Sequence, residues 1–188
     1  MSLKKTSSGA LTRVALLRGI NLAGRNRLPM KGLIEIFGAA GCTDVSTYIQ
    51  SGNVLFNAPA ALIKRLPEVI TEQIAARFGC RVPVILRTSN QIARIISENP
   101  FLKMGKPEST LHVYFLANEP DASTVRSLDP DRSPPDAFRV LNREIYLHLP
   151  NGMGRTKLSN VYFDAKLATT STARNWATVL KLYELMQP

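Results

Sequence analysis

Cysteine and histidine are scarce in this chain of 188 residues, which contains two of each. Two cysteines, Cys42 and Cys80, are too few for a disulfide framework or for a four-ligand zinc site. Each follows a glycine where an expected helix meets an expected strand, so we predict that both are small buried thiols. The sequence predicts no bound metal and no cofactor.

The two histidines lie in expected strands, which does not favour a Ser-His-Asp triad, because such a triad needs its histidine beside a nucleophile. His112 alternates with Tyr114, and Tyr146 alternates with His148. This Tyr/His face could stack on bases or pack against the other half of the chain. We predict packing. RNA recognition by base stacking is also not favoured for the basic half, because its equivalent strands offer only Phe56.

Acidic residues are also few, with 14 Asp and Glu against 24 Lys and Arg, which gives a formal net charge of +10. Residues 1–87 contain twelve basic and four acidic residues, whereas residues 88–188 contain twelve and ten. A basic half indicates either an anionic partner or charge that only keeps the protein in solution. Four acidic residues in residues 1–87 do not support paired catalytic carboxylates or an acidic metal site.

Long apolar runs are missing, since no run approaches the ~18 residues of a membrane-spanning helix. The first nine residues lack the apolar centre of a signal peptide. We therefore expect residues 1–12 to be a disordered tail, no membrane partner, and a cytoplasmic protein. Apolar residues make up 45% and charged residues 20% of the chain, which is ordinary for a globular protein.

The order of the expected elements predicts an α+β fold of two ferredoxin-like α/β plaits. In the first half, residues 13–87, the pattern is β-α-β-β-α-β. Expected strands cover 14–17, 45–50, 54–56 and 82–86, and expected helices cover 29–40 and 60–78. We interpret this half as a basic N-terminal plait.

The second half, residues 88–188, repeats this order with changes. Its expected elements are a helix at 89–96, strands at 111–116, 138–141 and 144–149, a short helix at 122–128, and C-terminal helices at 157–167 and 172–186. We expect a modified plait with extra C-terminal helices, in which the last strand is missing or is supplied from elsewhere.

The first candidate for a ligand site is the segment from Arg18 to Arg27. It leaves an expected strand and enters a helix N-terminus, where free N–H groups and the helix dipole favour anions. Arg18, Arg25 and Arg27 supply donors, and two glycines allow close approach of the backbone. The segment is neither G-x-G-x-x-G nor a P-loop, and an ordinary loop with exposed arginines is the alternative.

The second candidate is the segment from Thr47 to Asn53. Tyr48 and Gln50 lie on one face of an expected strand, and Asn53 lies beside the turn that follows. These three side chains could form a polar site. The alternative is a plain hairpin turn at Ser51-Gly52, because serine and glycine are common turn residues.

Two further candidates lie near the C-terminus. In the segment Gly152–Leu158, Arg155 and Lys157 precede an expected helix, where their charge opposes the dipole unless an anion is bound. In the segment Thr169–Val179, hydroxyl residues indicate a helix N-cap, and Arg174 and Asn175 could contact a ligand or brace a neighbouring loop. Trp176 has the spacing of a core residue.

The motifs in these segments resemble those of the uncharacterised bacterial family called domain of unknown function 1697. They are R-G-I-N-x-x-G from Arg18, Pro29-Met30, T-Y-I-Q-S-G-N-V from Thr47, G-R-x-K-L from Gly154, and T-x-x-x-x-R-N-W-x-T-V from Thr170. The resemblance covers nearly everything from Arg13 onward. It implies two ferredoxin-like plaits in one cytoplasmic chain and implies no activity. Thr156 stands where the family usually has Ser, which keeps the hydroxyl.

We hypothesise that the protein binds an anionic, phosphate-bearing ligand, such as nucleic acid or a nucleotide, through its Arg-rich loops. The expected donors are Arg18, Asn21, Arg25, Arg27, Gln50, Asn53, Arg155, Lys157, Arg174 and Asn175. One alternative is an enzyme acting on a phosphorylated small molecule, with Tyr48, a histidine or Glu35 as proton acceptor. Another is a structural or protein-interaction module in which the motifs join the two halves. The sequence does not predict an oligomeric state.

Overall fold

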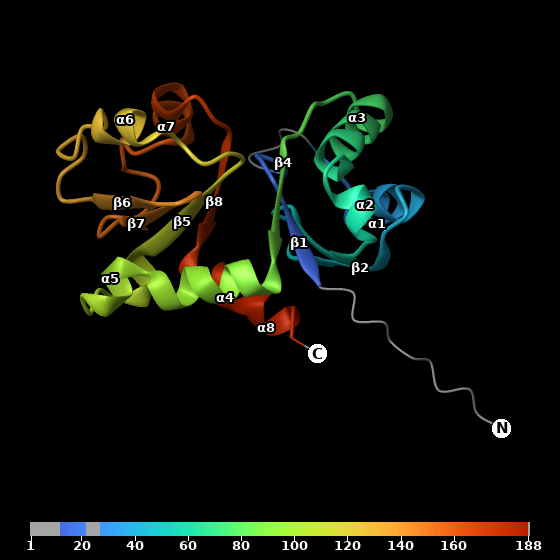
Figure 1. The fold of residues 1–188 in the computed structure, drawn as a ribbon, viewed down its shortest axis with the longest axis horizontal. Helices are drawn as coiled ribbons and strands as arrows, with labels where there is room; N and C mark the ends of the chain where they lie inside the picture. Colours follow the sequence, from blue (N-terminus) through green and yellow to red (C-terminus); the bar gives the residue numbers. More distant parts are fainter. Residues whose placement is uncertain (1–11, 22–26, 188) are drawn as a thin grey trace.

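The protein consists of two lobes, each with a four-stranded antiparallel sheet (Figure 1). The structure is a computed structural model that describes residues 12–21 and 27–187. The expectations for the tail at residues 1–11 and for Arg25 lie outside this range. The predicted α+β class is confirmed.

The first lobe has the strand order β2-β3-β1-β4, and all neighbouring strands are antiparallel. Its strands are β1 (Arg13–Leu17), β2 (Thr43–Tyr48), β3 (Asn53–Asn57) and β4 (Val84–Thr88), and its helices are α1 (Met30–Ala39), α2 (Ala60–Ile63) and α3 (Leu66–Phe78). The element order agrees with the predicted one, except that the expected helix at 60–78 is divided. Pro67 lies in the first turn of α3, where proline is tolerated because no intrahelical N–H bond is needed there.

The second lobe has the strand order β6-β7-β5-β8, again antiparallel throughout. Its strands are β5 (Leu111–Leu116), β6 (Ala137–Leu141), β7 (Glu144–His148) and β8 (Ser171–Asn175), and the helices beside them are α6 (Ala122–Arg126) and α7 (Asn160–Leu167), with a 3-10 turn, η1 (Glu108–Thr110), before β5. When the strands of each lobe are numbered from its first strand, the two sheets have the same spatial order, 2-3-1-4.

Strand β8 corrects the expectation that the second sheet lacks its last strand. We predicted a helix from residue 172, but residues 171–175 pair with β5, and α8 (Trp176–Leu185) begins after them. The hydroxyl residues do not cap this helix. Asn175 does so by accepting a hydrogen bond from the backbone N–H of Thr178 at 2.8 Å, and Ser171 and Thr172 are buried in the sheet.

The helix expected from residue 157 also begins later, at Asn160, with Ser159 as its N-cap. Arg155 and Lys157 therefore precede the cap and do not lie in the first turn. The conflict between their charge and the helix dipole, which favoured a bound anion at this place, does not occur in the structure.

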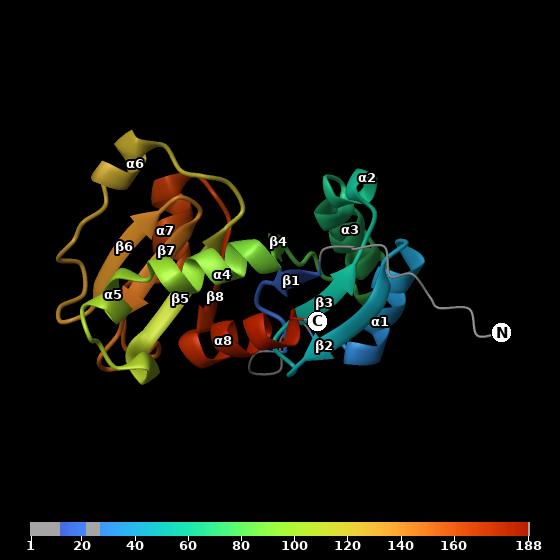
Figure 2. The ribbon, with the colours of Figure 1, turned by 60° about the horizontal axis from the view of Figure 1, so that its bottom comes forward.

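A shared core joins the two lobes. In Figures 1 and 2, α4 (Ser89–Glu98) and α8 run beside each other under both sheets, and α5 (Pro100–Lys103) continues from α4. One face of the first sheet packs on α1 and α3, and the other face contributes to this shared core. The core contains residues of both sheets and of the helices below them, among them Val14, Leu16, Leu55, Ile85, Ile92, Val113, Phe115, Trp176 and Val179. Trp176 is a core residue, as predicted.

The last strand of the first lobe leads directly into α4. Thr88 is both the last residue of β4 and the N-cap of α4, where it forms a capping box with Gln91. The helix expected at 89–96 therefore begins at the predicted residue, and Thr88 is its N-cap. No separate linker lies between β4 and α4, so the predicted boundary at residues 87 and 88 falls within a continuous strand–helix junction.

Candidate functional site

All four candidate segments line one pocket of about 420 Å³ between the lobes, which we call the motif pocket. Arg18 to Ile20 come from the first segment, and Ile49 and Ser51 come from the second. Met153 belongs to the third segment, and residues 172–175 belong to the fourth. The pocket forms because the end of β1 and the β2–β3 turn face β8.

Arg174 is the most heavily bonded side chain of the motif pocket. It is 7% exposed, and all five of its N–H groups are donated. Nε donates to Oδ1 of Asn53 at 2.5 Å, and the four Nη hydrogens go to oxygens of Leu17, Gly52, Thr172 and Ala173. None of these acceptors is a carboxylate, and burial lowers the pKa of Arg174 to about 10. Its positive charge is therefore buried among neutral hydrogen-bond acceptors.

Asn53 holds the other side of this contact. It is fully buried, and its Nδ2 donates to the carbonyl of Tyr48 at 3.1 Å and to the hydroxyl of Ser51 at 2.9 Å. Through their shared hydrogen bond, Asn53 and Arg174 connect β3 with β8, and Arg174 also donates to the carbonyl of Leu17 at the end of β1.

Gly52 is required by the close approach of the turn to β1. A Cβ at this position would lie 2.8 Å from Cβ of Leu17 and 3.0 Å from Cγ1 of Ile20, and its φ is +77°. Any other residue would be strained both by this φ and by the contacts of its Cβ with Leu17 and Ile20. Gly52 thus allows the β2–β3 turn to pack closely against the end of β1.

Arg18 forms an ion pair with Asp164 of α7, to which it donates one Nη1–H. The other oxygen of Asp164 accepts from the hydroxyl of Ser171 at 2.6 Å, and that hydroxyl accepts from Nδ2 of Asn160 at 3.1 Å. Burial, with Asp164 as the second cause, raises the pKa of Tyr114 in the same pocket to about 12. Asp164 could not be predicted from the sequence, because it belongs to none of the motifs and lies 146 positions from Arg18.

Four more of the predicted residues lie at the motif pocket or near the first two segments. Asn175 lines the motif pocket, whereas Arg27 and Gln50 are exposed at a separate hollow of about 470 Å³. The side chain of Asn21 bonds to Leu28 and Gln50. Its Nδ2 donates to the carbonyls of both residues, and its Oδ1 accepts from the N–H of Leu28.

Arg155 and Lys157 are exposed and lie outside the residues that line the motif pocket. Their segment reaches the pocket only through Met153, whose sulfur accepts from the hydroxyl of Tyr114 at 3.7 Å. The four segments thus converge, but the basic side chains of the third segment do not.

The histidines do not lie at the motif pocket. His112 lies on β5, a central strand of the second sheet, and burial lowers its pKa. His148 packs against Phe101, with ring centroids 5.9 Å apart. Within residues 12–21 and 27–187, no three His, Cys, Asp or Glu side chains are grouped as metal ligands. In the same part of the chain, no helix has the length and apolar character needed to cross a bilayer.

Fold and pocket define a two-lobed α+β protein in which sequence motifs from both lobes surround one cavity. The sequence matches the family model described as "Protein of unknown function (DUF1697)" over residues 11–146, and the chain belongs to this family. The matched range contains the first two motif segments and ends before the other two. No curated protein matches the sequence.

A solved structure of a conserved bacterial protein, SP0830 from Streptococcus pneumoniae, has the same overall fold. The two chains share 19% sequence identity, and the TM-score is 0.72. The alignment covers 94% of this chain and 99% of the other. At this identity the similarity concerns the fold alone.

Proposed function

We propose that this protein binds a compact phosphate-bearing ligand in the motif pocket. The observation that carries the proposal is that four segments, distant in the sequence, line one cavity between the lobes. Its volume of about 420 Å³ lies in the range of roughly 300–1,000 Å³ that is typical of small-molecule sites. A nucleotide or a phosphorylated metabolite fits this space better than a nucleic acid strand does.

Arg174 supplies the positive charge of the proposed site. Since all its N–H groups are donated to neutral acceptors, it attracts an anion through its electric field and makes no new hydrogen bond. Arg18 makes the direct contact, because it gives a single N–H to Asp164. Asp164 offsets the charge of Arg18, so the net attraction depends on Arg174.

Neutral donors complete the proposed site. Asn175 uses its Oδ1 to cap α8, which leaves its amide hydrogens available to a ligand. The N-terminus of α8 adds a partial positive charge at the same place. Ser51 and Thr178 contribute hydroxyl groups to the wall.

The other predicted donors have supporting roles in this proposal. Asn53 and Asn21 hold the loops in place. Arg27, Arg155 and Lys157 are exposed cations that steer an anion toward the junction by long-range attraction. Gln50 is neutral and offers only a side-chain amide at the hollow beside Arg27.

The titratable groups favour binding over catalysis. Tyr114 lies in the pocket, but its pKa of about 12 keeps it protonated at neutral pH. It therefore cannot accept a proton there. Both histidines and Glu35 lie outside the residues that line the motif pocket.

We also infer that each lobe is a ferredoxin-like plait. The order β2-β3-β1-β4 with β-α-β-β-α-β connectivity supports this inference, and β6-β7-β5-β8 repeats it. A cytoplasmic location stays a prediction from the sequence.

Calorimetric titration of the full chain with inorganic phosphate, pyrophosphate and AMP tests the proposed function. We expect Arg18→Gln to weaken binding about tenfold, which corresponds to ~1.4 kcal/mol. Asn175→Asp keeps an N-cap of equal quality but adds negative charge, so it should also weaken binding. The matched control is Arg94→Gln, because Arg94 lies on the surface of α4 and pairs with Glu98.

A second candidate function is that the motifs only join the lobes. The complete use of the Arg174 donors favours this function. It predicts that Arg18→Gln and Asn175→Asp leave any binding heat with the three probes unchanged. That result would contradict the proposed site.

A further inference from the structure

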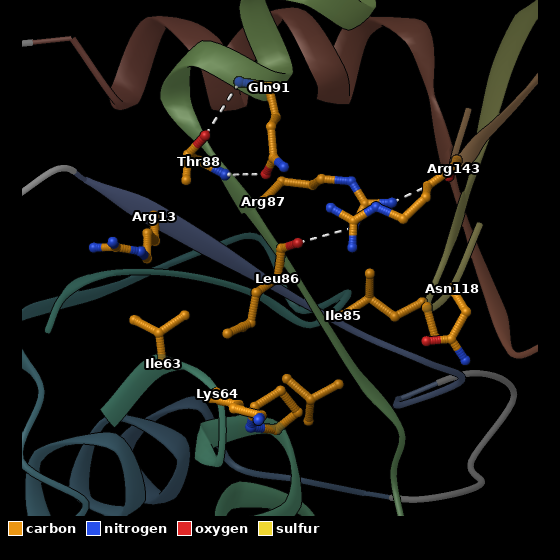
Figure 3. A pocket seen from close by; sticks show the side chains of 13 residues that line it. Arg13, Ile63, Lys64, Ile85, Leu86, Arg87, Thr88, Gln91, Asn118 and Arg143 are labelled. Atoms are coloured by element: carbon orange, nitrogen blue, oxygen red, sulfur yellow. Dashed lines mark hydrogen bonds between the residues drawn. The ribbon is translucent and has the colours of Figure 1, made fainter. Parts of the chain in front are cut away.

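A second cleft of about 490 Å³ lies between the lobes and shares no lining residue with the motif pocket. It lies at the start of β1, beside Arg13, whereas the motif pocket lies at the end of that strand. The first lobe supplies the α2–α3 region and β4, and the second lobe supplies Ala117, Asn118 and Arg143 (Figure 3). We call it the basic cleft.

The basic cleft is lined by four cationic side chains, and no acidic residue is among the described residues that line it. They are Arg13, Lys64, Arg87 and Arg143. Lys64 is exposed and Arg143 is half-buried, and neither has an ion-pair partner within the described part of the chain. Lys64 and Arg143 attract anions, because no ion pair offsets their charge in the described part of the chain.

Arg87 fixes the position of the β6–β7 turn that carries Arg143. Its Nε donates to Glu144 at 2.9 Å, and its Nη2 donates to the carbonyls of Leu116 and Arg143 at 2.8 and 3.1 Å. Burial is the first cause that lowers the pKa of Arg87, and the charge of Arg143 is a further cause. The two guanidinium groups thus repel each other weakly, and a bound anion would relieve this repulsion.

The remaining wall combines apolar surface with amide groups. Ile63, Pro67 and Leu86 offer apolar contacts, and Asn118 and Gln91 offer side-chain amides. Figure 3 shows that Lys64 approaches the space from the first lobe and Arg143 from the side opposite to it. The cleft therefore presents cations on two sides of a partly apolar floor.

We propose that the basic cleft binds a phosphate ester of nucleotide size. Lys64 and Arg143 hold its phosphate groups from the two lobes, and the uncharged remainder of the ligand packs on the apolar floor. A ligand with more than one phosphate fits best, because the cations stand on opposite walls. This site is independent of the proposed function of the motif pocket.

Titration of the full chain with ADP tests this proposal, with AMP and pyrophosphate as comparisons. We expect ADP to bind more tightly than either of these ligands, since it has both two phosphates and an apolar part. Lys64→Gln and Arg143→Gln should each weaken ADP binding about tenfold while the melting temperature without ligand stays unchanged. Lys31→Gln is the matched control, because Lys31 is exposed on α1 and lies outside the lining of both cavities.

Three outcomes would overturn the proposal. The first is an absence of ADP binding, and the second is ADP binding that Lys64→Gln and Arg143→Gln leave unchanged. One case of the second outcome is that Arg18→Gln abolishes ADP binding while Lys64→Gln and Arg143→Gln do not, which would show that ADP binds in the motif pocket. The third is tighter binding of a thymidine oligonucleotide than of ADP, with a steep loss of affinity between about 50 and 200 mM salt, which would indicate nucleic acid.

Discussion

Arg174 and Asn53 are 121 positions apart in the sequence, and the Nε–H of the arginine donates to the asparagine Oδ1 at 2.5 Å. This bond joins β8 of the second lobe to β3 of the first. Both residues belong to motifs that the sequence analysis assigned to a ligand site. In the structure the two side chains connect the lobes, and Arg174 also lines the motif pocket.

Replacement of Asn53 by alanine should destabilise the protein. The variant loses the bonds to Tyr48 and Ser51 and leaves the Nε–H of Arg174 buried without an acceptor. We expect a loss of about 3 kcal/mol in the free energy of unfolding, because a buried charged donor without a partner is costly. Urea denaturation measures this loss.

Asn57→Ala is the control for that experiment, because Asn57 lies at the other end of β3 and its amide donates to the exposed Asp44. It should change the free energy of unfolding by less than ~1 kcal/mol. Equal losses in the two asparagine variants would contradict the bracing role of Asn53.

Gly52→Ala should destabilise the protein by more than ~2 kcal/mol, because the new Cβ both requires an unfavourable φ and meets Leu17 and Ile20. Gly38→Ala provides a matched control within α1, where a Cβ has no atom within 4 Å. That change should stabilise the protein by ~0.5–1 kcal/mol, since alanine is the better helix former. Thermal unfolding of both variants would show opposite shifts, and shifts in the same direction would refute the packing argument at Gly52.

The buried pair of Arg87 and Glu144 also joins the lobes, and its two side chains are 1% and 4% exposed. Glu144→Gln leaves a buried guanidinium without a counter-charge, so we expect a loss of about 3–5 kcal/mol. The exposed pair of Arg77 and Glu35 is the comparison, and Glu35→Gln should cost less than ~1 kcal/mol. Guanidinium chloride denaturation of both variants measures the difference, and similar costs would show that burial does not matter here.

Cys42 should react slowly with thiol reagents. Burial raises the pKa of its thiol from 9.0 to about 11, so at pH 8 its thiolate fraction is about a hundredfold lower than that of an unperturbed thiol. Cys80 is only half-buried and should be alkylated first. Mass spectrometry after brief treatment with iodoacetamide distinguishes the two sites.

The same pKa shift makes stability depend on pH. Because the folded-state value lies above the unfolded value, the contribution of Cys42 is complete below about pH 9 and is lost as the pH rises toward 11. Cys42→Ala should remove this part of the alkaline loss. Rapid alkylation of native Cys42 at pH 8 would contradict both expectations.

The elements of the first lobe could be predicted because they rest on local patterns. Alternating or continuous apolar residues mark its strands, and Gly79, with φ of +72°, ends α3 as expected. The prediction failed at residues 172–175, where the local signal for a helix cap was overridden by pairing with β5 and by burial against the first lobe. Only tertiary contacts determine that strand.

The site could be predicted only in part. Motif spacing indicated which segments carry polar groups, and these segments do meet. The partner of Arg18 could not be found in this way, because Asp164 lies in a helix of the other lobe. The basic cleft was also missed, since Lys64 and Arg143 belong to no motif and come together only when the lobes pack.

The shared core has a consequence for biosynthesis. Val14, Leu16 and Ile85 on the first sheet are covered by α4 and α8, and α8 is translated a whole lobe later than β4. A nascent chain that ends before Trp176 therefore exposes an apolar sheet face that nothing made so far can cover completely. The first sheet is therefore closed on both sides only after α8 has been synthesised.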